Sequence, residues 1–296
     1  MIKLNPKRRK KMKVFDYVLY AMMGIFALIT VYPFIYVVFC SFSDGIDFSR
    51  GGIWLFPRVW SLSNYIVVFN DARLYSAFGI SIARTVLGTA VSLGFTSMVA
   101  YGMQRKELRY RSVLYWINIF TMFFGGGLIP YFLTIVELKL YDTFLVYIIP
   151  GMYSVYNMIV ISSFFRSIPE ELHEAAVLDG AGEFYIFSRI YIPLSGPVFA
   201  TVGMWIAVGH WGSYWDTMMY TTSDHLMTLQ YYLTRIVLQS QIPPANSSVP
   251  GYIYEQISPR TISFAAITLA SIPVLCIYPL IMKNFNSGIT VGSLKG

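Results

Sequence analysis

Charged residues are scarce in this sequence. Lys, Arg, Asp and Glu make up 12% of its 296 residues, and 56% of the residues are hydrophobic. Soluble domains average about 25% charged residues, so the deficit excludes an ordinary soluble domain and places the chain in the membrane class. The net charge of +7 does not indicate a nucleic-acid partner, because the basic residues cluster beside apolar runs.

Cysteine and histidine are also rare. Cys40 and Cys276 lie in separate apolar runs, so we expect two buried, unreactive thiols with neither a disulfide nor a metal site. His173, His210 and His225 are too scattered to form a metal or nucleophile–base set, which argues against a membrane enzyme. No G-x-x-x-x-G-K-[ST] sequence occurs, so the chain lacks the usual phosphate loop of P-loop ATPases.

Long apolar runs dominate what is present. A helix needs about 20 residues to cross roughly 30 Å of hydrocarbon. Six runs are long enough, and they cover residues 14–43, 76–103, 112–136, 143–165, 197–220 and 261–283. The first run is too long for a signal peptide and shows no cleavage site, so we expect it to be retained. The sequence therefore predicts an all-α polytopic membrane protein with six transmembrane helices.

The basic residues predict the orientation of these spans. Residues 1–13 carry seven Lys or Arg, and the connections and tail expected on the same side carry eight more. The opposite side carries six. Because cytoplasmic segments are enriched in Lys and Arg, we expect both termini in the cytoplasm. This divides the chain into a basic N-terminus (1–13), a first helix (14–43), an extracellular loop (44–75), a core that holds the other five spans (76–283) and a cytoplasmic tail (284–296).

Glycine and proline stand inside several of the predicted spans. The stretch "FFGGGLIPYF" contains three glycines and Pro130, and Pro150 and Pro273 fall in later runs. Broken backbone at membrane depth needs protein or water to satisfy it. A bundle with irregular interior helices is more typical of a transporter than of an anchor, although Gly and Pro are common in membrane helices generally.

The 166–196 connection is polar but has the features of folded structure. Ser167 and Glu170 have the spacing of a capping box. Glu170, Glu171 and Glu174 fall in the first turns of the predicted helix, where its dipole favours acidic side chains. Gly180 is placed to end that helix in a left-handed conformation, and a second helical stretch follows from Glu183 to Tyr191.

The predicted first helix of this hairpin has a small apolar face formed by Leu172, Ala175 and Ala176. Helices that bind lipid surfaces usually carry Lys and Arg on the polar face, whereas this one is acidic. The pattern favours a protein partner over anionic lipid. A hairpin that lies on its own bundle is the alternative.

The stretch "EAAVLDGAGEFYIFSRIYIP" matches the signature of permease subunits of ABC importers without departure. Its members here are Glu174, Ala175, Ala176, Gly180, Ile190, Ile192 and Pro193. The chain also resembles the second permease of maltose-type importers. The stretches "FFGGGLIP", "FRSIPEELHEAA", "AVGHWGSYWD" and the tail "NSGITVGSLKG" resemble permeases for complex, often plant- or alginate-derived oligosaccharides.

The resemblance implies a type I ABC importer permease in a bacterial cell membrane. It implies that the 166–196 hairpin couples a non-catalytic chain to two separate ATPase subunits, which bind ATP and Mg²⁺ while this chain binds no cofactor. It further implies a second homologous permease, an extracellular solute-binding protein and a sugar substrate. A secondary transporter or channel is the alternative, but no Asp or Glu lies deep inside a predicted span to form an ion site.

The stretch "GHWGSYWDTMMY" offers candidate substrate contacts. These are His210, Trp211, Tyr214, Trp215 and Asp216. Aromatic residues near the outer end of a span also form interfacial belts, and a histidine also joins helices, so structural roles stay open.

Arg84 lies about nine residues into the second predicted span. A charge at the bilayer centre costs roughly 2.5–3.5 kcal/mol, so we expect Arg84 to face the bundle interior. There it either pairs with Asp216 or meets an acidic sugar such as a uronate. The outer segments 44–75 and 221–260 are candidates for contact with a solute-binding protein, and the stretch "QIPPANSSVPGY" is expected to be irregular surface.

Overall fold

The computed structural model describes the backbone of residues 14–239, 242–243 and 249–292. Within these residues the protein is helical, and an isolated bridge between Ser43 and Trp60 is its one strand-like pairing. The all-α prediction is therefore confirmed for the described part. The basic segment 1–13, part of "QIPPANSSVPGY" and the last four residues of the tail lie outside it, and what was predicted for them stays a prediction.

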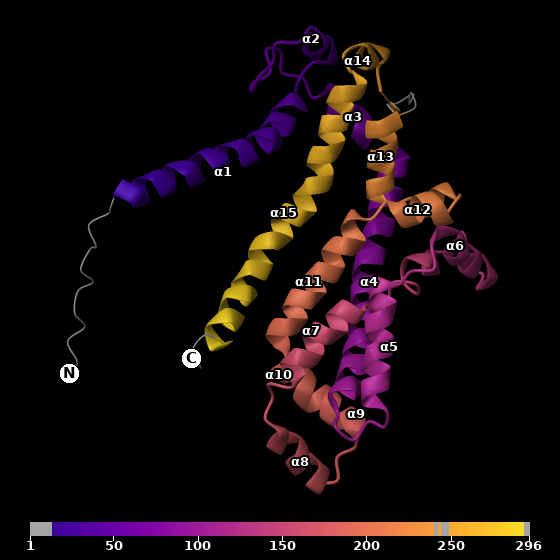
Figure 1. The fold of residues 1–296 in the computed structure, drawn as a ribbon. Coiled ribbons are helices and arrows are strands. Elements are labelled where there is room, and N and C mark those ends of the chain that lie inside the picture. Colours follow the sequence, from indigo (N-terminus) through magenta and orange to yellow (C-terminus); the bar gives the residue numbers. More distant parts are fainter. Residues whose placement is uncertain (1–13, 240–241, 244–248, 293–296) are drawn as a thin grey trace.

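Among the residues that the structure describes, three helices are long and apolar enough to cross a membrane. They are α1 (Val14–Cys40), α4 (Ala72–Gln104) and α15 (Pro259–Gly292). Figure 1 shows α4 running through the bundle while α1 diverges from it. Of the α1 residues only Cys40 is buried, so most of this helix presents apolar side chains outward. The side of the membrane for each terminus stays a prediction.

The remaining predicted spans are broken. The run 112–136 forms α5 (Arg111–Phe123) and α6 (Leu128–Glu137), and the chain bends by 112° between these two helices. The break falls on the three glycines as expected, because Gly127 adopts a φ of 90° that suits glycine. Within the described part of the chain, this pair and a second bent pair, Glu183–Leu194 with Gly196–Gly212, bring the number of candidate spans to at most five, so the count of six stays a prediction.

The fourth and fifth runs are not single helices either. Residues 143–165 form η1 (Phe144–Tyr147), an irregular stretch and α7 (Val155–Phe165). Residues 197–220 form α11 (Gly196–Gly212) and α12 (Trp215–Tyr220), separated at Ser213 and Tyr214. Sequence hydropathy records apolar length but not continuity, which explains why both runs were predicted as whole helices.

Hydroxyl groups on α4 satisfy part of the irregular stretch after η1. The Ser92 hydroxyl donates to the Gly151 carbonyl at 2.9 Å, and the Thr96 hydroxyl donates to the Met152 carbonyl at 3.5 Å. Carbonyls freed by the break at Pro150 thus find partners within the protein, which is the condition for broken backbone at membrane depth.

Two minor sequence predictions are wrong. Pro273 does not interrupt its span, because α15 continues through it. The backbone carbonyl of Ala270, one turn before Pro273 on α15, accepts a hydrogen bond from the Trp211 indole at 3.4 Å. Cys40 is buried as expected, but Cys276 is exposed on the surface of α15.

The end of the molecule that carries α2 and α14 is also helical. It contains α2 (Gly45–Ser49), α3 (Ser63–Phe69), η3 (Asp224–Leu226), α13 (Leu229–Gln239) and α14 (Gly251–Glu255). Helix α14 begins inside the stretch expected to be irregular, so that expectation is wrong from Gly251 onward. Buried side chains of α3, α4, α13 and α15 form one core here.

Candidate functional site

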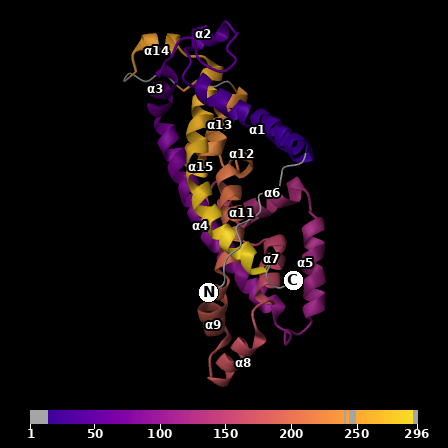
Figure 2. The same ribbon diagram turned by 90° about the vertical axis from the view of Figure 1, so that its left-hand side faces the viewer.

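The polar hairpin lies at the opposite end of the molecule from α2 and α14 (Figures 1 and 2). It consists of α8 (Glu170–Leu178), α9 (Glu183–Ile186), the π-helical turn η2 (Phe187–Tyr191) and α10 (Ile192–Leu194). The chain bends by 86° between the helical segment from Glu183 to Leu194 and α11.

The predicted capping box at the start of α8 is wrong. The residue that caps α8 is Pro169, and no side chain bonds to the free amides there. The Ser167 hydroxyl instead donates to the Phe164 carbonyl at 2.6 Å. Glu170 forms an ion pair with Lys106 at 2.6 Å, so its carboxylate points toward the α4–α5 connection rather than back to Ser167.

The predicted end of α8 at Gly180 is confirmed. Gly180 has a φ of 79°, its amide donates to the Val177 carbonyl at 2.9 Å, and the Ala181 amide donates to the Ala176 carbonyl at 3.0 Å. This pair of bonds is a Schellman motif. It turns the chain sharply and sends α9 back toward the bundle.

The signature residues lie mainly on the surface of the hairpin. Glu174, Ala175, Gly180 and Pro193 are exposed, while Ala176 and Ile190 are half-buried against the aromatic core. Large apolar side chains are exposed beside them, with Leu178 at 87% and Phe184 at 74%. An apolar surface on a polar hairpin is a feature expected of a docking element.

A polar network joins the hairpin to the end of α4. His173 is 5% exposed, and its Nδ1 lies 3.2 Å from the Arg105 guanidinium. Its Nε2 lies 3.2 and 3.3 Å from the two carboxylate oxygens of Glu183, which also accepts a hydrogen bond from the Tyr101 hydroxyl. Burial alone would raise the pKa of Glu183, but the bonds from Tyr101 and His173 hold that pKa below its ordinary value.

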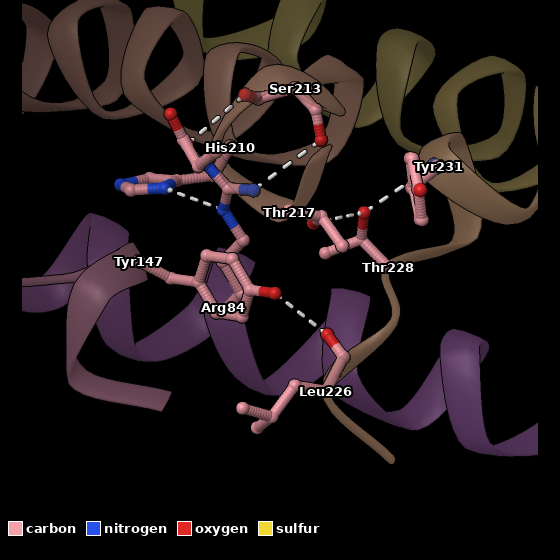
Figure 3. A network of polar contacts seen from close by, with 9 residues as sticks. Arg84, Tyr147, His210, Ser213, Thr217, Leu226, Thr228 and Tyr231 are labelled. Carbon is pink, nitrogen blue, oxygen red and sulfur yellow. Dashed lines mark hydrogen bonds and ion pairs between the residues drawn. The ribbon is translucent and has the colours of Figure 1, made fainter. Parts of the chain in front are cut away.

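The second candidate site surrounds Arg84 in the middle of α4. Arg84 is 3% exposed and forms an ion pair with Asp216 at the start of α12. Its Nε donates to His210 Nδ1 at 3.4 Å, and Nη1 donates to the Ser213 carbonyl at 3.3 Å (Figure 3). The break between α11 and α12 therefore supplies both a carbonyl and a carboxylate to this guanidinium. The structure brings together Arg84, His210 and Asp216 of the predicted set.

Aromatic rings complete the surroundings of Arg84. Its guanidinium carbon lies 4.7 Å from the centre of the Tyr147 ring, a cation–π distance. The Tyr147 hydroxyl donates to the Leu226 carbonyl at 2.7 Å, which fixes the ring. A cavity of about 330 Å³ opens here, with Tyr131 and Tyr220 in its wall. These tyrosines were missed because the sequence contains 23 of them and no spacing marks these three.

The other predicted substrate residues lie elsewhere. Trp211 is buried in the core and packs edge-on against Phe78. Tyr214 and Trp211 line an apolar groove of about 500 Å³ between α1, α11, α13 and α15. Trp215 is 45% exposed. None of these three lines the cavity beside Arg84.

Comparison with known proteins identifies the family. Residues 92–291 match the family described as the binding-protein-dependent transport system inner membrane component. The chain belongs to this family. It is accordingly a multi-pass protein of the bacterial cell membrane and a permease of the ABC importer type, as the signature predicted.

Full-length relatives and a solved structure agree with this assignment. The polygalacturonan/rhamnogalacturonan transport system permease protein YtcP of Bacillus subtilis (strain 168) is 37% identical over 97% of this chain and 100% of its own length. Protein LplC of the same organism is 34% identical over 96% of each chain. A chain in the crystal structure of a bacterial ABC transporter involved in the import of the acidic polysaccharide alginate superposes with a TM-score of 0.86, at 31% identity over 95% of this chain and 100% of that one.

Proposed function

We propose that this chain is the non-catalytic transmembrane permease of an ATP-driven importer that carries a sugar or oligosaccharide. The observation that supports this most strongly is the hairpin. It combines the complete signature from Glu174 to Pro193, a left-handed turn at Gly180 and exposed apolar side chains at one end of the bundle. Such a surface suits a docking partner, and we propose that this partner is an ATPase subunit.

The ATPase partner would supply all of the nucleotide chemistry. The sequence has no phosphate loop, so we assign ATP and Mg²⁺ to a separate chain, and the family resemblance implies two such ATPase subunits. Closure of those subunits around ATP would move the hairpin and switch the bundle between inward- and outward-facing states. A second homologous permease completes the membrane part, and the outer end with α2 and α14 is the surface offered to a solute-binding protein.

Co-purification tests this assignment. A second permease and an ATPase are expected to co-purify with the tagged chain when it is expressed together with its neighbouring genes. Glu174→Lys should weaken recovery of the ATPase, because Glu174 is exposed on the docking helix. Glu255→Lys is the matched control, since it reverses a charge that is also exposed but lies on α14 at the other end. Recovery of the tagged chain alone would favour the secondary transporter or channel.

For the substrate we propose an oligosaccharide that contains acidic sugars. Two relatives support the class, since one is named for polygalacturonan and rhamnogalacturonan and one belongs to an alginate importer. Arg84, His210, Asp216 and the tyrosine-lined cavity form the proposed path, and Trp211 and Tyr214 line a separate apolar groove. The Arg84–Asp216 pair would neutralise the cavity until a uronate competes for the guanidinium.

Arg84→Gln separates the two roles of this arginine. If Arg84 meets a uronate, uptake of oligogalacturonate should fall more than uptake of a neutral oligosaccharide of the same length. Equal loss for both substrates would sink the uronate contact and leave a purely structural pair. The double variant Arg84→Gln/Asp216→Asn controls for the Asp216 carboxylate that Arg84→Gln leaves without its partner, because that side chain is 31% exposed and only partly solvated.

A further inference from the structure

Helix α8 has a single buried side chain. That side chain is His173, which is 5% exposed, whereas the other α8 residues are exposed apart from the half-buried Ala176. The attachment of α8 to the rest of the molecule, other than through the chain itself, therefore rests mainly on this histidine. Figures 1 and 2 show α8 projecting beyond the ends of the neighbouring helices.

The partners of His173 define which nitrogen carries the proton. A guanidinium only donates hydrogen bonds, so His173 Nδ1, 3.2 Å from Arg105, must accept. The proton then resides on Nε2, which faces the Glu183 carboxylate at 3.2 and 3.3 Å. The neutral ring thus bridges the residue that ends α4 and the first residue of α9.

Glu183 closes this network back onto α4. It accepts a hydrogen bond from Tyr101, whose ring packs edge-on against Phe165 and Tyr191 in the aromatic core. The pairs Lys106–Glu170 and Arg105–Glu107 lie nearby, but each has a side chain that is 66% or more exposed. Exposed ion pairs contribute little. The Glu183 side chain is itself 60% exposed, but that of His173 is 6% exposed and that of Arg105 is 17% exposed, so the His173–Arg105 contact is the most shielded of these links between α8 and α4.

The same helix reaches the cavity. Tyr101 and Arg84 are 17 residues apart on the uninterrupted α4, which corresponds to about 26 Å along a helix axis at about 1.5 Å per residue. At the Arg84 end, α4 is bonded to Ser213 and Asp216 at the break between α11 and α12. Helix α4 therefore connects the hairpin network to the candidate substrate cavity.

We propose that His173 is a positioning residue that makes α4 move together with the hairpin when the ATPase subunits close. This rests on the proposed coupling function of the hairpin. The chain itself links the hairpin to α11 through α10, so motion reaches α11 covalently. Motion of α8 itself reaches α4 through His173, whereas η2 packs directly on Tyr101 of α4 through Phe187 and Tyr191. Without the bridge, α8 can rotate about its flanking turns while α4, and with it Arg84, stays behind.

The test uses the complex purified on a tagged chain. His173→Phe keeps a ring of similar size and removes both polar contacts. His173→Gln keeps an amide that can accept from Arg105 and donate to Glu183. His225→Phe is the matched control, because His225 is exposed on η3 at the other end. Three quantities are measured: ATPase recovery, basal ATP hydrolysis, and stimulation of hydrolysis by the solute-binding protein loaded with an oligogalacturonate mixture.

His173→Phe is expected to keep ATPase recovery and basal hydrolysis while stimulation falls by roughly fivefold or more. His173→Gln should retain most of the stimulation, and His225→Phe all of it. If His173→Phe keeps stimulation at the wild-type level, the proposal is overturned. Loss of ATPase recovery in this variant also overturns it, because His173 would then be a docking residue. If the wild-type chain itself recovers no ATPase, the proposed coupling function is overturned. That result is distinguishable from both outcomes for His173→Phe, because it appears without any substitution.

A second variant guards against misfolding of His173→Phe. The Glu183 side chain is 60% exposed, so Glu183→Gln is tolerated sterically and weakens the same bridge. It should lower stimulation, and the double variant should be no worse than the more severe single one, because both changes break one link. Additive losses would contradict a single bridge through His173 and Glu183.

Discussion

Gly180 adopts a left-handed backbone although nothing crowds it. Its φ is 79°, and a Cβ built there would have no atom within 4 Å. A substitution is therefore opposed by backbone strain alone, at roughly 1–2 kcal/mol for an ordinary residue. The hairpin turn depends on this conformation, so its substitution separates conformation from packing.

Gly180→Val is expected to reduce the stimulation of ATP hydrolysis by loaded binding protein, because a β-branched residue resists positive φ. Gly180→Asn should be close to wild type, since Asn tolerates the left-handed region. Both variants present a larger side chain at the same exposed place. If Asn is as damaging as Val, the defect lies in surface contact and the conformational explanation is wrong.

Asp142 holds together the turn before η1 and the turn after α12. Its carboxylate accepts hydrogen bonds from the amides of Thr222 and Ser223 at 2.9 Å and from the Ser223 hydroxyl at 2.6 Å. The Ser223 hydroxyl, followed by these amides, lowers the pKa of Asp142 to about 2. Because the folded pKa lies below the unfolded one, the stabilisation is present above about pH 4 and is lost as the pH falls toward about 2.

Asp142→Asn should remove this pH dependence. The variant is expected to have a lower melting temperature than wild type at pH 7. The difference should shrink as the pH falls from about 4 to about 2, since both chains then lack the carboxylate. Thermal unfolding of the detergent-purified chain measures it. A difference that is constant over this range would show that the charge of Asp142 does not contribute.

At the scale of elements, α4 and α11 meet at a close approach. A Cβ placed on Gly88 would lie 2.5 Å from His210 Nε2, whereas one on Gly94 of the same helix would meet nothing within 4 Å. The His210 ring cannot swing aside freely, because its Nδ1 contacts Arg84. Glycine at 88 therefore sets the separation of the two helices beside the cavity.

Gly88→Ala is expected to destabilise the chain by roughly 1–3 kcal/mol through overpacking. Gly94→Ala should be neutral or slightly stabilising, because alanine suits a helix interior better than glycine. Melting temperatures of the two variants test this. Equal melting temperatures would mean that α4 and α11 separate without cost, and that the packing around Arg84 is loose.

The elements that the sequence predicted well are those with a strong local cause. The membrane class, α1, α4, the break at the three glycines and the left-handed Gly180 follow from hydropathy or glycine chemistry. The bend between α11 and α12, the hydroxyl contacts of Ser92 and the His173 bridge depend on residues far apart in the chain. Arg84 and Asp216 were foreseeable as partners because a buried charge needs one, but their tyrosine surroundings were not.

At the scale of the whole molecule, one long helix joins two ends of different composition. The polar hairpin lies at one end, the packed helices α2, α3, α13 and α14 lie at the other, and α4 extends between them (Figure 1). The charged cluster around Arg84 occupies its middle. This arrangement fits a bundle with two states, in which contacts at the hairpin select the state and the two states differ at the cavity.

Cross-linking from the hairpin tests the central claim most directly. Leu178→Cys, in a chain with Cys276→Ser, places a thiol at an 87% exposed position of α8, and Phe56→Cys places one at a 58% exposed position on the outer end. With a thiol cross-linker in native membranes, position 178 is predicted to capture a protein that contains a phosphate-loop ATPase sequence, and position 56 is not. Capture of no such protein from position 178, in membranes that retain transport, would contradict the account.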